Sequence, residues 1–180
     1  MGQIVCVSKI TEAMYKAAIE AGINKCLALA AKELNKPVGD FAVREVMPAT
    51  DLGYTTEVWD NENQLTAVTW TKDIGHSLDN DEYLVILGIQ NQTDDPQVVG
   101  VKFKVGSSGA TTRDVQMFEQ LYAEDIHKAL FKEPIIYKGN EYVYIEYYAK
   151  TTVAAAGEKI GLIAYLIKPY GEDISAPLPW

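Results

Sequence analysis

The sequence predicts a mostly β protein, an antiparallel β-sandwich that is jelly-roll-like, with about eight strands. Three observations predict this fold class. From Val38 onward, turn-forming residues recur at short intervals and the hydrophobic period changes towards two. Eight segments between those turns have strand character, the strand number of a jelly roll. Most connections are too short for the helical crossover of a parallel sheet, as the seven residues of Asn91–Gln97 illustrate.

Length and composition indicate a single folded domain, in which residues 1–37 pack on a sandwich formed by residues 38–180. Of the 180 residues, 48% are hydrophobic and 23% are charged, which excludes a disordered chain. The net charge of −9 repels phosphate backbones, so we expect no direct nucleic-acid partner. No apolar run approaches the ~20 residues of a membrane helix, and no secretion signal is recognised, so we expect no membrane contact.

The N-terminal segment predicts a short strand followed by two helices. Ile4–Val7 is a short apolar run with strand character. Alanines and other apolar residues recur at helical spacing over residues 12–21 and again over residues 24–34. Gly22 is expected to stop the first helix, and Pro37 to follow the end of the second. The two helices would form a lid over one sheet face or an arm onto a neighbouring molecule.

Eight strands are expected after this segment. A polar turn at Asp60–Asn63 predicts a hairpin between the second and third of them. The run Tyr83–Leu87 is apolar on both sides, which predicts a central strand. The expected strands are Phe41–Val46, Tyr54–Asp60, Leu65–Thr71, Tyr83–Gln90, Val98–Val105, Ile135–Tyr137, Tyr142–Ala149 and Ile160–Lys168.

One segment interrupts the β pattern. Thr112–Lys132 has helical periodicity, with Val115, Phe118 and Leu121 on one expected face. Glu133-Pro134 supplies a stop, because the residue before a proline disfavours helical geometry. The sequence therefore predicts one inserted helix near residues 112–132.

The C-terminal hairpin carries more apolar and aromatic surface than a single core requires. Counting by twos, one face of Tyr142–Ala149 is suited to fill the core. The opposite face carries Tyr142, Tyr144 and Tyr148 around Glu146, and it predicts contact with a neighbouring subunit or a flat ligand. Trp180 ends a Pro-Leu-Pro-Trp tail that is suited either to docking on a partner or to folding back on its own domain.

No residue set reaches the standard of a catalytic or metal-binding signature, so neither an enzyme nor a cofactor is expected. Asp79–Glu82 gathers acids that resemble a calcium turn, but it lacks the glycine of an EF-hand loop and is expected to be a solvated turn. Cys6 and Cys26 show no metal-ligand spacing and are expected to be free thiols in a reducing compartment. His76 and His127 lie in unrelated contexts and are expected at the surface.

The surplus aromatic surface suggests a role in assembly with neighbouring subunits, and two further functions are considered beside it. Trp59 and Trp70, expected on neighbouring strands, are compatible with a carbohydrate-binding platform, although paired tryptophans more often pack in a core. The third hypothesis is a cupin-like metal enzyme. It is the weakest, because the chain has only two histidines and no His-x-His pair.

The order of features in Lys132–Gly171 resembles the closing strands of jelly-roll capsid and capsid-cement proteins of tailed phages and related viruses. Those features are an apolar pair after proline, a Gly-Asn turn, a long aromatic strand, a small-residue loop and a final apolar strand. The resemblance implies a virion structural protein without catalytic residues. It would be assembled in the host cytoplasm as a trimer or larger homo-oligomer, in contact with other shell proteins.

Overall fold

The computed structural model describes residues 4–6, 11–124 and 126–171, and over these residues the protein is a β-sandwich with an N-terminal helix. The fold class predicted from the sequence is confirmed. Trp180 and the C-terminal tail lie outside the described residues. The elements are β1 (Ile4–Cys6), α1 (Glu12–Leu34), the 3-10 turn η2 (Val38–Asp40), β2 (Phe41–Glu45), α2 (Pro48–Leu52), β3 (Trp70–Ser77), β4 (Tyr83–Asn91), β5 (Val98–Val105), β6 (Thr111–Met117), α3 (Glu119–Ala123), β7 (Lys128–Tyr137), β8 (Tyr142–Ala149) and β9 (Ile160–Pro169).

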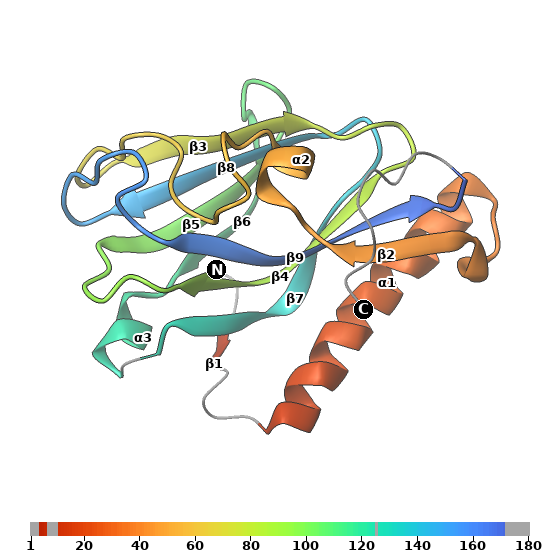
Figure 1. The fold of residues 1–180 in the computed structure, drawn as a ribbon, viewed down its shortest axis with the longest axis horizontal. Helices are drawn as coiled ribbons and strands as arrows, with labels where there is room; N and C mark the ends of the chain where they lie inside the picture. The colour runs from red at the N-terminus through yellow and green to blue at the C-terminus, as the bar shows by residue number, and fades with distance from the viewer. Residues whose placement is uncertain (1–3, 7–10, 125, 172–180) are drawn as a thin grey trace.

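The described strands form two antiparallel sheets that pack face to face (Figure 1). One sheet has five strands in the order β1-β7-β4-β9-β2, and the other has four in the order β3-β8-β5-β6. β2 pairs with β9, β3 with β8, β4 with β7 and β5 with β6, so the pairs are nested like one long hairpin. Additional pairs, β4 with β9 and β5 with β8, roll this hairpin into two sheets. This is the pairing of a jelly roll.

The main core lies between the two sheets. On β8, the side chains of Val143, Ile145 and Tyr147 are fully buried there, as the alternation of the sequence predicts. β4 and β9 are buried on both faces, because the other side of the five-stranded sheet is covered by α1.

The N-terminal helix is continuous, so the prediction of two helices was wrong. The Thr11 hydroxyl accepts a hydrogen bond from the Met14 backbone N–H at the start, and Asn35 in the left-handed conformation ends the helix. Gly22 does not stop the helix. A Cβ built there would lie 2.2 Å from a methyl carbon of Leu87, so this glycine lets the helix approach β4 closely.

The inserted helix is much shorter than predicted. Only α3 is helical, and the rest of residues 112–132 belongs largely to β6 and β7. Ala129, Leu130 and Phe131 of β7 are all buried, because the main core lies on one face of the strand and α1 covers the other, so this stretch shows no simple alternation. A strand buried on both faces resembles a helix in its apolar spacing, which explains the error.

The hairpin predicted between residues 54 and 71 is also wrong, because residues 54–69 form a loop and the strand begins at Trp70. Side chains inside the loop bond to its own backbone and to α2, and such bonds compete with a strand ladder. Glu57 accepts hydrogen bonds from the backbone N–H groups of Ala49 and Thr50. Asn61 donates to the carbonyl of Ala154, which holds the loop against the connection before β9.

Candidate interaction face

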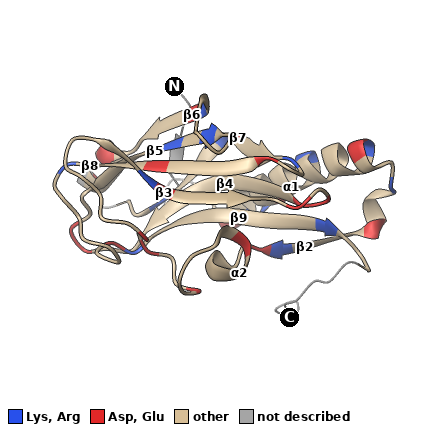
Figure 2. Ribbon diagram, turned by 90° about the horizontal axis from the view of Figure 1, so that it is seen from above, with Lys and Arg blue, Asp and Glu red and all other residues tan. Residues whose placement is uncertain are grey.

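The outer face of the four-stranded sheet is covered by no helix in the described part of the chain. α1 packs on the five-stranded sheet, at the opposite side of the sandwich (Figures 1 and 2). We call the outward side chains of β3, β8, β5 and β6 the open face. They include Trp70, Lys72, Ser77, Lys102, Lys104, Thr112, Val115, Met117, Tyr142, Tyr144, Glu146 and Tyr148.

A buried carboxylate organises the centre of the open face. Glu146 is 8% exposed and lies opposite Lys102 in the β5–β8 register. Its two oxygens contact the Lys102 and Lys104 ammonium groups at 3.4 and 3.0 Å. Both lysine side chains are less than one fifth exposed, which is low for surface lysines. The three side chains therefore form a fixed polar layer on the sheet.

The tyrosine rings at one end of the open face are partly covered by lysine side chains. The Lys72 ammonium lies 5.5 Å from the centre of the Tyr142 ring and 5.0 Å from that of Tyr144. The ammonium of Lys104, on the neighbouring strand β5, lies 5.2 Å from the centre of the Tyr144 ring. Such cation–π contacts contribute about 0.5–1 kcal/mol each at exposed sites. The rings are half-buried and remain accessible from solvent.

The other end of the open face is mainly apolar, although the Lys102 ammonium lies 4.1 Å from the centre of the Trp70 ring. Trp70 and Tyr148 face each other across β3 and β8, with ring centres 5.3 Å apart. Trp70 and Met117 meet above Gly100, where an added Cβ would lie 3.0 Å from Trp70 and 2.7 Å from the Met117 sulfur. Met117 is 38% exposed. This end offers a solvent-accessible surface of two rings and one flexible thioether.

Val68 precedes this apolar end in an unfavourable backbone conformation. Its φ of 55° is in the left-handed region, which a β-branched residue rarely adopts. The backbone N–H of Val68 donates to the carbonyl of Ala149 at 2.8 Å, so the turn is held against the end of β8. Its side chain is 67% exposed. The strained turn presents an apolar side chain to solvent close to Trp70, and backbone strain of this kind is often found at functional sites.

The structure brings together some of the residues singled out from the sequence and separates others. Tyr142, Tyr144 and Tyr148 share the open face, and Trp70 joins them. Trp59 does not lie beside Trp70. It belongs to the loop before β3 and packs on Gly161 of β9 in the other sheet, so the expectation of neighbouring tryptophan strands was wrong.

The lysines of the open face were missed from the sequence. The alternation Lys102-Phe103-Lys104 places two basic residues on the face opposite a fully buried ring, and this signal was present in the chain.

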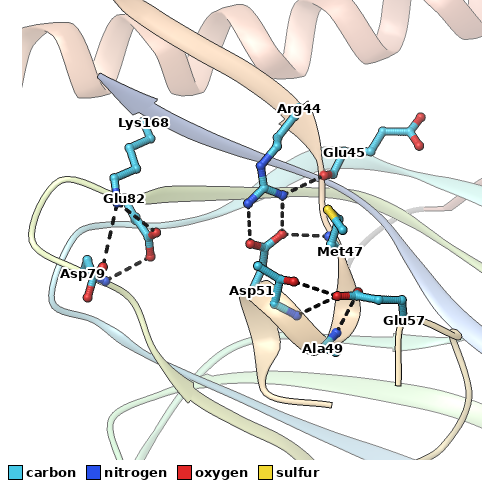
Figure 3. Close-up of polar contacts among 10 residues, drawn as sticks. Arg44, Glu45, Met47, Ala49, Asp51, Glu57, Asp79, Glu82 and Lys168 are labelled. Carbon is cyan, nitrogen blue, oxygen red and sulfur yellow. Dashed lines mark hydrogen bonds and ion pairs between the residues drawn. The ribbon is translucent and has the colours of Figure 1, made fainter. Parts of the chain in front are cut away.

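The other candidate positions show structural roles. Among the described residues, no group of three His, Cys, Asp or Glu side chains could hold a metal ion. The Asp79 backbone N–H donates to the Glu82 carboxylate, and Lys168 lies 3.5 Å from Glu82, which closes the acidic turn (Figure 3). Burial, followed by the charge of Glu33, raises the pKa of the Cys26 thiol to about 12, so this thiol is unreactive at neutral pH.

No helix in the described ranges has the length and hydropathy required to cross a bilayer. Comparisons with protein-family models, with curated proteins and with solved structures gave no match for this chain.

Proposed function

We propose that the protein is a structural component of a viral particle, either a shell subunit or a cement protein, and that it assembles through the open face. The observation that carries the proposal is the mainly apolar end at Trp70, Tyr148 and Met117, which no helix covers in the described part of the chain, with the exposed Val68 two residues before Trp70. Tryptophan and tyrosine are enriched among the residues that dominate binding at protein interfaces. The jelly-roll pairing supports the proposal as an analogy of fold, and it does not carry it alone.

Charge indicates which surface of a neighbour would be contacted. The chain has a net charge of −9, whereas the open face carries three lysines and one glutamate. An acidic surface on a second copy is therefore its natural complement. The loop before β3 supplies such a surface with Glu57, Asp60 and Glu62. A contact between two different surfaces is heterologous, and repeated heterologous contacts build rings and larger assemblies.

The expected strength of the contact depends mainly on the aromatic residues. Burial of apolar area contributes about 25 cal/mol per Å² before the costs of association. The lysines add specificity and faster association rather than most of the affinity, because their charges are already paired with Glu146 or placed over rings.

Light scattering coupled to size-exclusion chromatography tests this proposal. We expect a trimer or larger oligomer whose population rises with protein concentration and falls with salt, because salt screens charge complementarity. Trp70→Ala combined with Tyr148→Ala should shift the protein to monomer. Tyr170→Ala is the matched control, since Tyr170 is 59% exposed and lies outside the open face. A monomer at every concentration and salt level would overturn the proposal.

A further inference from the structure

A second candidate site lies away from the open face, where β2 ends beside β9. β2 follows β9 only as far as the pair Glu45 and Tyr165, and a final backbone bond joins Val46 to Ala164. Beyond that point the loop before β3 packs against β9, and Trp59 contacts Gly161. A cleft of about 250 Å³ lies between the end of β2 and this loop, and Tyr15 of α1 lines its third side.

The register of the five-stranded sheet explains why the cleft is hollow. Lys128, Gln90 and Gly161 lie opposite one another in a row across β7, β4 and β9. Gly161 contributes no side chain to this row, and a Cβ there would lie 2.6 Å from Trp59. Trp59 can therefore lie directly on the sheet as a wall of the cleft, and the space beside it stays open to the ends of Gln90 and Lys128.

Aromatic rings from three separate elements line the cleft. Tyr15 comes from α1, Trp59 from the loop and Tyr165 from β9. The Lys128 ammonium lies 4.7 Å from the centre of the Tyr15 ring, which fixes that ring at the border of the cleft. All three residues are half-buried.

Hydrogen-bonding groups of both kinds accompany the rings. Glu45 offers an acceptor, Lys128 offers donors, and the Gln90 amide offers one of each kind. Burial, followed by the charge of Glu45 and a side-chain hydrogen bond with it, raises the pKa of Tyr165. In the described part of the chain, the Gln90 side chain makes no hydrogen bond, and its amide is available to a ligand.

We infer that this cleft binds a single pyranose ring of a carbohydrate. A pyranose has an apolar C–H face that packs on aromatic rings and an edge of hydroxyl groups that both donate and accept hydrogen bonds. The cleft is smaller than the ~300 Å³ at which pockets for drug-sized ligands begin, which suits one ring rather than a longer glycan. A nucleotide is disfavoured, because the net charge of −9 repels its phosphate groups.

Titration of the full chain with a panel of neutral hexoses, N-acetylated amino sugars and their methyl glycosides, followed by NMR, tests the inference. We expect saturable binding of at least one sugar, with the largest shifts in signals of Gln90 and Trp59. Gln90→Ala and Trp59→Ala should each weaken binding by about tenfold or more, corresponding to about 1.4 kcal/mol. Tyr170→Ala is the matched control, because Tyr170 is 59% exposed and lines neither the cleft nor the open face, and it should leave the affinity unchanged.

Three results would overturn the inference: no saturable binding of any sugar, binding that survives both substitutions in the cleft, or binding lost in Tyr170→Ala alone. Trp59 also packs edge-on against the buried Tyr54, with ring centres 5.6 Å apart, so Trp59→Ala could destabilise the fold. If Trp59→Ala fails to fold, Gln90→Ala still decides the test. Assembly through the open face is measured separately by light scattering, so either proposal can fail without the other.

Discussion

Arg44 and Asp51 form a bidentate ion pair that is almost closed to solvent (Figure 3). Both N···O distances are 2.5 Å, and the two side chains are only 9% and 4% exposed. Asp51 also accepts the Met47 backbone N–H at 2.7 Å, so the pair fixes the start of α2 against β2. The hydrogen bond with Asp51 is the largest cause of the raised pKa of Arg44.

Removing one partner of this pair should be more harmful than removing both. Asp51→Ala leaves the Arg44 guanidinium buried without its hydrogen-bonded counter-charge, and we expect a loss of about 3–5 kcal/mol in the free energy of unfolding. Arg44→Met combined with Asp51→Leu should be less destabilised, because no charge is left unpaired. Urea unfolding measures both. A double variant less stable than Asp51→Ala would contradict this account.

The buried carboxyl of Asp73 should make stability depend on pH. Burial is the largest cause that raises its pKa to about 7, and the nearby Glu62 and Asp60 act in the same direction. The backbone N–H groups of Asn63 and Glu62 oppose the shift, and one carboxyl oxygen is buried without a hydrogen-bond partner among the described residues. Burial, followed by the charge of Asp73, raises the pKa of Tyr147 well above its usual value.

The direction of the pH effect follows from linkage. The folded state holds the Asp73 proton up to about pH 7, whereas the unfolded chain releases it near pH 3.8. Its contribution to stability is therefore complete below the unfolded pKa and is lost as the pH rises from about 4 to about 7. Asp73→Asn should remove this slope, so the variant should gain a few kcal/mol over the parent between pH 4 and pH 8. A constant difference between the two across that range would refute the assignment.

Glu158 is expected to be essential for stability although it has no basic partner among the described residues. It is 2% exposed, and its carboxylate accepts hydrogen bonds from the Asn91 amide at 2.7 Å and from the backbone N–H groups of Gln97 and Val98. Glu158→Ala leaves these buried donors unsatisfied, at about 1–3 kcal/mol for each group. We expect Glu158→Gln to be intermediate and the exposed control Glu119→Ala to be near neutral in thermal unfolding. A Glu158→Ala melting curve that matches the control would contradict the prediction.

Val68 should limit stability and support assembly. Glycine adopts the left-handed conformation without strain, so Val68→Gly should stabilise the monomer by up to about 1 kcal/mol. The same change removes an exposed apolar side chain beside Trp70 and should weaken oligomerisation. Chemical unfolding and light scattering on one sample measure the two effects. An increase in stability with unchanged assembly would show that Val68 has no part in the interface.

Local sequence patterns predicted the strands that have one buried face and one more exposed face. The alternation in β8 correctly assigned Val143, Ile145 and Tyr147 to the core, and it placed Tyr144 outside. The same rule failed for the first part of β7, because cores lie on both faces there and the successive residues Ala129, Leu130 and Phe131 are all buried. A different rule, that a glycine ends a helix, failed at Gly22, because this glycine instead allows close packing on Leu87.

The candidate sites depended on long-range pairing, which a single sequence does not show. Trp59 and Trp70 are close along the chain, yet one packs on β9 and the other faces Tyr148. The cleft beside Trp59 combines residues from α1, β2, β4, β7 and β9, and no spacing in the chain predicts that meeting. The tyrosines of the open face could be found in advance, since they lie on a single strand.

The nested strand pairs set an order for folding. The β5–β6 pair closes the shortest loop, whereas the outermost pair joins Phe41 to Pro169 across most of the polypeptide. Closing a longer loop costs more chain entropy, and topologies rich in such distant contacts fold slowly. On the ribosome, the β2–β9 pair cannot form until nearly all of the described chain has emerged, which leaves earlier strand edges exposed to chaperones or to sister chains.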